Sequence, residues 1–218
     1  MSVEEFFDAT AERYDRRYED STAAGRLLRR RLQVAVELLG EPRGDVLDVG
    51  MGTGRLCAEL DGRGWRVSGV DLSPGMVAAA RRRLPQLAER LVEGPIEHLP
   101  FADEAFDAVT ATGVLEYATR NLNGAVAELA RVLHPEGVAV MSFPRQQSPA
   151  LLWRSMLLYP VVRAAKRILP LGRPAPLDLP PRSEREFLAA VSEAGLSAEE
   201  TRRIGRFASQ LVLQARKP

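Results

Sequence analysis

The chain has 218 residues, of which 45% are hydrophobic and 27% charged, as expected for one globular α/β domain over residues 1–218. Its formal net charge of +1 gives no reason to expect nucleic acid as a partner, and its single cysteine, Cys57, excludes an intrachain disulfide and a cysteine metal cluster. No secretory signal or membrane-spanning apolar run is evident, so we expect a cytoplasmic location.

The N-terminal segment, residues 3–39, is expected to be helical because apolar residues recur there at near-helical spacing. Glycine and proline at 40–44 end this segment. Strands and helices then alternate up to residue 143, which implies parallel strands joined by right-handed crossovers. The expected strands are 45–49, 66–70, 90–93, 106–110 and 138–143, the expected helices are 55–63, 74–84 and 122–133, and 135–137 is expected to be a turn.

The alternation of strands and helices ends at residues 144–182. This segment is a proline-rich insertion that contains a long apolar and basic stretch at 151–169. This stretch has three interpretations: a lid over a greasy substrate, a weak contact with an anionic membrane surface, or a dimer contact or plain packing. The chain is accordingly expected to be a monomer or a homodimer. Beyond the insertion we expect a helix at 184–195 and two antiparallel strands at 197–206 and 207–215.

A glycine loop, Gly50-x-Gly52-x-Gly54, follows the buried strand 45–49. Glycine accepts a positive φ and has no side chain to block a ligand, and the helix after the loop directs free N–H groups toward that ligand. Asp71 ends the next apolar run, seventeen residues after Gly54. The loop and Asp71 therefore predict a nucleoside-binding site in which the carboxylate holds the ribose.

The spacing of the loop distinguishes between nucleotide sites. A dinucleotide fold requires G-x-G-x-x-G, but Arg55 stands where the third glycine would be. A P-loop requires a lysine that the loop lacks. An NAD(P)-dependent oxidoreductase therefore remains only as a weaker alternative.

The segment from Asp48 to Gly54 resembles motif I of the class I S-adenosylmethionine-dependent methyltransferases. Four further segments resemble motifs of this family in the same order: 69–76, 93–101, 106–109 with 114–117, and 131–137. The match spans about residues 1–145 and the C-terminal strands, and is similar to small-molecule enzymes of ubiquinone and menaquinone biosynthesis. It implies an α/β fold with a Rossmann-like, seven-stranded, mostly parallel sheet, helices on both faces and an antiparallel last strand. It also implies a helical N-terminal cover at 1–40 and a substrate lid at 144–182 after strand five.

The resemblance implies S-adenosylmethionine as the cofactor, S-adenosylhomocysteine as its product, and a small-molecule acceptor. Asp71 is expected to accept the ribose hydroxyls, and Asp48 to brace the loop and face the ammonium group, or else to serve a purely structural role. The full set of expected cofactor residues is Asp48, Gly50, Met51, Gly52, Thr53, Gly54, Asp71, Leu72, Met76, Pro95, Ile96, Glu97, Ala111, Thr112, Tyr14 and Tyr18.

Some of these assignments carry alternatives. Related enzymes often have Asp-Ala where this chain has Pro95-Ile96, so Glu97 is expected to replace the missing acceptor for the adenine amino group. Met76 is expected either on the ribose–adenine face or in the core. Tyr14 and Tyr18 are expected either to touch the cofactor or substrate or simply to pack.

Methyl transfer from sulfonium is an in-line displacement, and a general base helps only if the acceptor loses a proton. The catalytic candidates are Tyr117, which stands where related enzymes often have histidine, and Glu116 beside it. The alternatives are that Tyr117 packs on the following helix and that Glu116 is structural. No metal is expected. We favour an apolar or aromatic acceptor, with O-methylation ahead of N- or C-methylation. A protein that binds S-adenosylmethionine without methyl transfer, or that uses it for another reaction, is the main alternative. His98 and His134 are expected on the surface.

Overall fold

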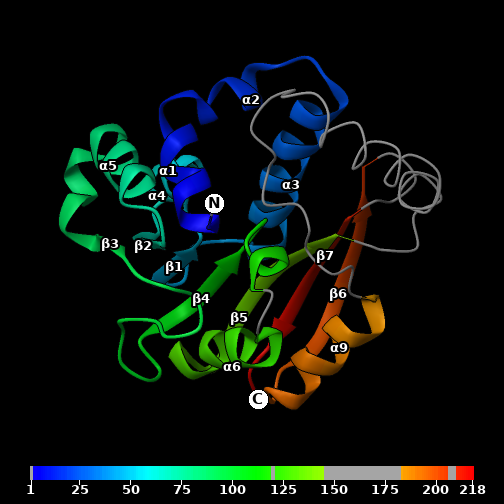
Figure 1. The fold of residues 1–218 in the computed structure, drawn as a ribbon. Coiled ribbons are helices and arrows are strands. Elements are labelled where there is room, and N and C mark those ends of the chain that lie inside the picture. Colours follow the sequence, from blue (N-terminus) through cyan, green and yellow to red (C-terminus); the bar gives the residue numbers. More distant parts are fainter. Residues whose placement is uncertain (1, 119–120, 145–182, 206–209) are drawn as a thin grey trace.

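The computed structural model describes residues 2–118, 121–144, 183–205 and 210–218. Within these residues, seven strands form one sheet in the order β3-β2-β1-β4-β5-β7-β6, with helices on both faces (Figure 1). The strands are β1 (Asp45–Val49), β2 (Arg66–Asp71), β3 (Leu91–Glu93), β4 (Phe106–Ala111), β5 (Leu133–Pro144), β6 (Ser197–Ile204) and β7 (Gln210–Arg216). The helices are α1 (Val3–Tyr14), α2 (Arg16–Glu19), α3 (Ala23–Leu39), α4 (Arg55–Gly62), α5 (Pro74–Arg83), α6 (Leu122–Val132) and α9 (Glu184–Glu193), with 3₁₀ turns η1 (Pro85–Arg90) and η2 (Leu115–Tyr117).

The direction of the strands confirms the predicted Rossmann-like fold. β1 pairs in parallel with β2 and β4, β2 with β3, and β4 with β5, whereas β7 runs antiparallel to both β5 and β6. Helix α4 follows β1 and helix α5 follows β2. After β3, the chain crosses to β4, which lies on the other side of β1, so the strand order reverses there. In such sheets, ligands bind at the carboxyl ends of the strands where the order reverses, here between β1 and β4.

The described residues form two core clusters, one on each face of the sheet, because successive side chains of a strand point to opposite faces. In β1, Val46 packs with residues of α3, α4 and α5, whereas Leu47 packs with residues of α6 and α9. The side chains of Val46 and Leu47 are both fully buried. The sheet is therefore covered on both faces, as near-continuous apolar parallel strands require (Figure 1).

The N-terminal cover is three helices rather than the continuous helix expected over 3–39. The first break falls at Asp15, whose side chain leaves the helix to accept hydrogen bonds from the loop at Thr53 and from Arg55. The second precedes α3, where the Thr22 hydroxyl caps the new helix by accepting the Gly25 N–H. Tertiary contacts and capping thus override the continuous helical pattern.

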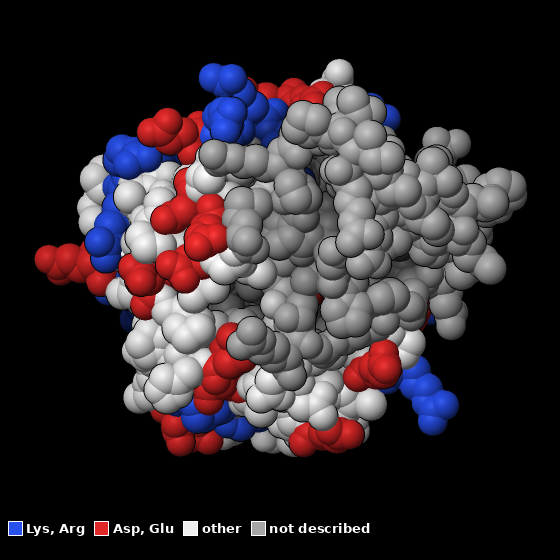
Figure 2. Space-filling model, in the orientation of Figure 1, with Lys and Arg blue, Asp and Glu red and all other residues white. Residues whose placement is uncertain are grey.

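The cover carries opposite charges on adjoining helices. Figure 2 shows acidic side chains over α1 and basic side chains over α2 beside it. The exposed acidic residues of α1 are Glu4, Glu5, Asp8 and Glu12. This places negative charge on the helix that lies closest to the start of α5 and the carboxyl end of β2 (Figure 1).

β5 begins at Leu133, so the turn expected at 135–137 is part of a strand. Phe106 pairs with Leu133 and Ala108 with Val138, so four residues of β5 bulge opposite one residue of β4. Two backbone hydrogen bonds hold the bulge. The Glu136 N–H donates to the Lys217 carbonyl, and the Lys217 N–H donates to the Gly137 carbonyl. Backbone pairing with the C-terminus thus satisfies groups that the sequence alone assigns to a turn.

Most of the insertion at 144–182, including the stretch 151–169, lies outside the described residues. Pro144 itself ends β5 and pairs with Gln210 of β7. No helix in the described part of the chain is long and apolar enough to cross a membrane.

Candidate functional site

The glycine loop between β1 and α4 needs glycine at each of its three positions. Gly50, Gly52 and Gly54 have φ angles of 71°, 55° and 75°, a region that residues with side chains rarely adopt. A Cβ atom at Gly50 would lie 2.6 Å from Cβ of Val114, so the loop touches the segment that follows β4. A Cβ atom at Gly52 would meet only Tyr14 Cε1, at 3.9 Å. The space beside Gly52 is therefore the place where the loop is open to a ligand.

The other loop residues are held by the protein. The Gly50 and Met51 N–H groups donate to the Val70 carbonyl, at 2.8 and 3.1 Å. The Met51 side chain is buried and packs on Gly69 of β2, and Thr53 is buried under the cover. These contacts fix the loop before any ligand arrives.

Asp71, at the end of β2, ties the loop to the start of α5. Its Oδ2 atom accepts the Gly52 N–H at 2.8 Å, and its Oδ1 atom accepts the Ser73 N–H at 3.0 Å. Burial raises the pKa of Asp71, these N–H groups lower it, and the charge of Asp8 raises it further. A carboxylate oxygen accepts more than one hydrogen bond, so both oxygens keep acceptor capacity.

Asp48 is buried at the end of β1, and its hydrogen-bond partners among the described residues are neutral. The Thr110 hydroxyl donates to its Oδ1 atom at 2.7 Å, and the Cys57 thiol lies 3.5 Å from its Oδ2 atom. Burial raises the pKa of Asp48 to about 7, and the negative charge of Asp71 contributes to the rise. A positively charged neighbour would stabilise the ionised form of this buried carboxyl group.

Two aspartates of the N-terminal cover contact the elements around this loop, and neither is among the residues expected from the sequence. Asp8 of α1 accepts the Ser73 hydroxyl and the Gly75 N–H, both at 2.7 Å, and these bonds lower its pKa. Asp15 accepts the Thr53 hydroxyl at 2.6 Å and pairs with the guanidinium groups of Arg55 and Arg83.

The contacts of Asp8 and Asp15 fix the position of the N-terminal cover. Although burial opposes it, the hydrogen bonds and the Arg83 charge lower the pKa of Asp15. Arg83 also donates to the Thr53 carbonyl at 2.9 Å, so one arginine joins α5, the loop and the cover. The cover is thus fastened at one end to the start of α5 and at the other to the glycine loop.

Aromatic side chains line the inner side of the cover. Phe7 packs edge-to-face on Tyr117, with ring centroids 5.1 Å apart, and Tyr14 lies between Phe7 and Tyr18 at 6.1 and 6.2 Å. Arg55 stacks over the Tyr18 ring at 4.8 Å. Burial raises the pKa of Tyr18 and Tyr117 to about 12 and that of Tyr14 as well, so these phenols stay neutral near pH 7.

Arg31 of α3 brings a buried positive charge into the site. Only 7% of its surface is exposed, and a Cβ atom at Gly113 would lie 2.4 Å from its guanidinium nitrogens. Its charge acts to lower the pKa values of Asp48 and Glu116. The sequence does contain a signal for this residue: Arg31 lies four positions from Leu27 and four from Ala35, on the apolar stripe of its helix.

Glu116 and Tyr117, the catalytic candidates, lie in η2 directly after β4. The turn is closed by the Tyr117 N–H, which donates to the Val114 carbonyl at 2.8 Å. Burial raises the pKa of Glu116, and its Oε2 atom is buried with no hydrogen-bond partner in the described part of the chain. Two candidates from the sequence thus come together with Tyr14 and Arg31, which approach from other helices.

The remaining predicted residues are placed as follows. Leu72 is 39% exposed and is the exposed large hydrophobic residue among those described. Met76 is 1% exposed, yet belongs to neither core cluster of described residues. In the loop after β3, Ile96 is buried, and Pro95 and Glu97 are exposed. Ala111 is buried at the end of β4, and Thr112 after it is half-buried. His98 and His134 are exposed, as expected.

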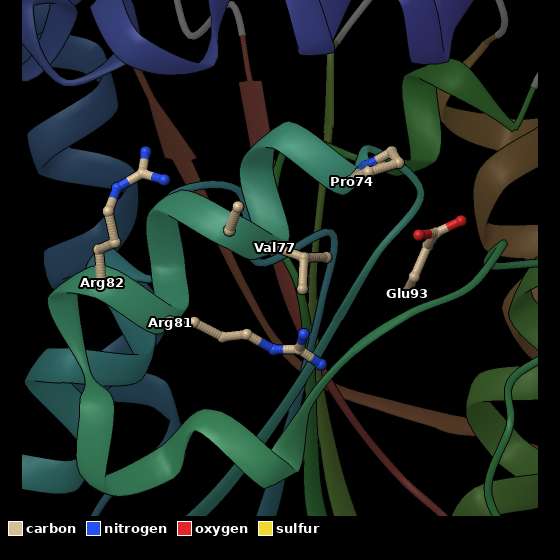
Figure 3. Close-up of a pocket in the computed structure, with 6 residues that line it drawn as sticks. Pro74, Val77, Arg81, Arg82 and Glu93 are labelled. Atoms are coloured by element: carbon tan, nitrogen blue, oxygen red, sulfur yellow. The ribbon is translucent and has the colours of Figure 1, made fainter.

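Two surface grooves border this site. One, of about 460 Å³, lies between α5 and β3, where Arg81 and Glu93 approach it from opposite sides (Figure 3). The other, of about 600 Å³, lies between α3 and α4, and of the predicted residues only Tyr18 borders it. Within the described residues there is no group of three or more His, Cys, Asp or Glu side chains suited to a metal ion.

Comparison with known proteins agrees with this geometry. Residues 47–141 match the family model described as a methyltransferase domain. The chain is 41% identical over 141 residues to a demethylmenaquinone methyltransferase of Beutenbergia cavernae, covering 62% of this chain and 55% of that protein. It is 37% identical over 175 residues to the enzyme of the same name from Mycobacterium sp. (strain KMS), covering 76% of this chain and 71% of that protein.

Solved structures share the fold. The magnesium protoporphyrin IX methyltransferase of Synechocystis PCC 6803, with bound SAH (S-adenosylhomocysteine), superposes with a TM-score of 0.71 at 20% identity, covering 99% of this chain and 98% of that one. The chain spans little more than half the length of the first curated relative.

Proposed function

Because the chain belongs to the class I S-adenosylmethionine-dependent methyltransferases, we propose that it transfers a methyl group from S-adenosylmethionine to a small aromatic or apolar molecule. S-Adenosylmethionine is the cofactor of this class, and supplies a methyl group activated on a positively charged sulfur. The observation that carries the proposal is the group of three aspartates around the glycine loop, Asp8, Asp48 and Asp71.

These aspartates suit a cationic ligand. The pKa values of Asp48 and Asp71 are raised by burial first and by neighbouring negative charge as well. A ligand that carries a sulfonium and an ammonium group relieves this repulsion, whereas an anionic dinucleotide increases it. The open space beside Gly52 leaves room for the ligand to reach the loop.

The ribose and adenine positions follow from Asp71 and its neighbour. The Asp71 carboxylate, oriented by the Gly52 and Ser73 N–H groups, keeps acceptor capacity for the two ribose hydroxyls. Leu72 exposes an apolar side chain directly beyond Asp71, which suits contact with an adenine face. Ile96 and Glu97 remain the residues proposed for the edge of the ring.

Arg31 suits the carboxylate of the cofactor's amino-acid part. Its guanidinium lies on Gly113, the segment after β4 that also contacts the loop through Val114 and Gly50. A buried cation is stable when it meets an anion, and guanidinium matches carboxylate in geometry. Arg31 therefore adds an anchor for the cofactor that the glycine loop alone does not supply.

The N-terminal cover excludes water from the reaction. Asp8 and Asp15 hold it over the loop, and the Tyr14 ring lies against Gly52. Such closure holds two reactants in line, which is the main requirement of a displacement on an activated methyl group. The aromatic rings of Phe7 and Tyr117 give this space an apolar wall that suits an aromatic acceptor.

The insertion at 144–182 is proposed to complete the acceptor site as an apolar lid. Deletion of 151–169 is then expected to preserve S-adenosylhomocysteine binding and to abolish turnover. A loss of cofactor affinity in calorimetry would contradict the lid.

Methyl transfer is tested with tritium-labelled S-adenosylmethionine and a panel of quinols, phenols and amines. Incorporation of label into a phenol or quinol oxygen is the expected result, since O-methylation is favoured. Tight binding of the cofactor with no transfer to any class of acceptor would favour the alternative of a cofactor-binding protein without this activity.

A further inference from the structure

Glu116 is held in place by the short turn η2 at the carboxyl end of β4. Leu115 is 1% exposed and anchors the turn in the core, and the Tyr117 N–H closes it on the Val114 carbonyl. Val114 in turn lies against Gly50 of the glycine loop. The Glu116 carboxyl group thus belongs to a hydrogen-bonded turn that adjoins the proposed cofactor loop.

One oxygen of this carboxyl group has no hydrogen-bond partner among the described residues. Glu116 Oε2 is buried, and no residue in the described ranges donates a hydrogen bond to it. A buried acceptor without a donor costs about 1–3 kcal/mol, more when it is charged. A chain that retains such a group at its ligand site has an acceptor ready for a donor on the ligand.

The surroundings of Glu116 come from α3, α1 and η2 itself. Arg31 of α3 is the cation that acts on its charge, and the phenols of Tyr14 from α1 and Tyr117 from η2 both feel the Glu116 charge. Arg17 of α2 also acts on both of these phenols. The carboxyl group therefore lies near the aromatic wall and the buried guanidinium of Arg31, beside the loop.

We infer that Glu116 is the proton acceptor of the reaction, and that its Oε2 atom takes the proton of an acidic hydroxyl carried by a planar ring. The inference rests on the proposed function. As the acceptor oxygen forms its bond to the methyl carbon, the bond from that carbon to sulfur breaks and its electron pair stays on sulfur. The hydroxyl proton passes to Oε2, so a sulfonium, a neutral phenol and a carboxylate become a thioether, an ether and a carboxylic acid.

The basicity of a carboxylate limits the class of acceptor. A phenol has a pKa near 10, whereas an unactivated hydroxyl such as that of water has a pKa of about 15.7. Burial raises the pKa of the Glu116 carboxyl group, although the Arg31 charge opposes the rise. Such a base suits the first and is far too weak for the second. The acceptor is accordingly a phenol or hydroquinone rather than an aliphatic alcohol.

The test compares Glu116→Gln with wild type on two phenols in alkaline buffer. 4-Nitrophenol is ionised there, and 4-methylphenol keeps its proton. Glutamine keeps the shape of the side chain but cannot take a proton, so the variant should lose about 10²–10⁴-fold in rate with 4-methylphenol. With 4-nitrophenol, which needs no base, the variant should retain its rate within a few-fold. Glu89→Gln, at an exposed position in η1, is the matched control and should behave as wild type with both phenols.

Cofactor binding separates this inference from the proposed function. Calorimetry should give the same S-adenosylhomocysteine affinity for Glu116→Gln and wild type. A large loss of affinity would mean that Glu116 holds the cofactor ammonium group instead, and would overturn the inference. Equal losses with both phenols, or no methyl transfer by wild type to either phenol, would also overturn it. Failure of the wild-type protein to bind S-adenosylhomocysteine would contradict the proposed function itself.

Discussion

Thr110 donates a 2.7 Å hydrogen bond from its hydroxyl to Oδ1 of Asp48, on the neighbouring strand. The two residues face each other in the register of β1 and β4, at the point where the strand order reverses. The bond keeps the Asp48 carboxyl group inside the sheet, behind the glycine loop. Asp48 thus acts on the site through its charge. Its carboxyl group has no cationic hydrogen-bond partner among the described residues.

The stability of the ligand-free protein should depend on the ionisation of Asp48. Its pKa is about 7 in the folded chain and near 3.8 when unfolded, so the folded state binds the proton more tightly. Its contribution to stability is therefore present at low pH and is lost as the pH rises from about 4 to about 7. Asp48→Asn should remove this loss, which is at most about 4 kcal/mol.

Urea unfolding of wild type and Asp48→Asn across this pH range measures the difference. The comparison between the two proteins cancels the opposite contributions of Asp8 and Asp15, whose pKa values are lowered. A difference in unfolding free energy that does not change with pH would show that Asp48 titrates normally.

The cover should open more readily when Asp15 is replaced. Asp15→Ala removes the acceptor shared by Thr53, Arg55 and Arg83, so S-adenosylhomocysteine should dissociate about tenfold faster, which corresponds to 1.4 kcal/mol. Stopped-flow displacement of the bound ligand gives this rate. Glu12→Gln, an exposed change on the same helix, is the control. Equal rates in wild type and Asp15→Ala would exclude a role of this contact in ligand release.

Two glycines of the loop should respond differently to alanine. Gly50→Ala brings a methyl group to 2.6 Å from Val114, so overpacking adds about 1–3 kcal/mol to the cost of a positive φ. Gly52→Ala carries mainly the backbone strain, about 1–2 kcal/mol, because only Tyr14 lies nearby. Its methyl group fills the open space, so cofactor affinity should fall far more than stability. Thermal unfolding together with calorimetry distinguishes these effects, and unchanged affinity in Gly52→Ala would place the ligand elsewhere.

Arg31 should matter only for ligands that carry a carboxylate. Arg31→Met keeps an apolar stem of similar length but removes the charge, so S-adenosylhomocysteine affinity should fall by about 1.5–3 kcal/mol. 5′-Methylthioadenosine lacks the amino-acid part and should bind both proteins equally. A parallel loss for both ligands would show that Arg31 supports the fold of the site instead.

The sheet was accessible from the sequence because its signals are local. The alternation of strands and helices, the Ser73-Pro74 helix start and the three glycines each act through neighbouring residues. The errors arose where distant contacts decide. The break at Asp15 depends on Thr53 and on arginines far along the chain, and the start of β5 depends on pairing with Lys217.

The site was accessible only where a motif marks it. Asp48, Asp71 and the glycines belong to recognisable segments, whereas Asp8 lies in an ordinary acidic helix and meets Ser73 only through folding. Arg31 has a signal in the sequence, because it is a charged residue on the apolar stripe of its helix. The pattern of apolar residues alone does not include it. The unpartnered oxygen of Glu116 is a property of packing and has no trace in the sequence.

The proposed ligand of the glycine loop and its aspartates is a cationic nucleoside rather than a dinucleotide. Calorimetric titration of the wild-type chain with S-adenosylmethionine, S-adenosylhomocysteine and NADH tests it most directly. We expect saturable binding of the two S-adenosyl compounds and none of NADH. Binding of NADH without either S-adenosyl compound would contradict it.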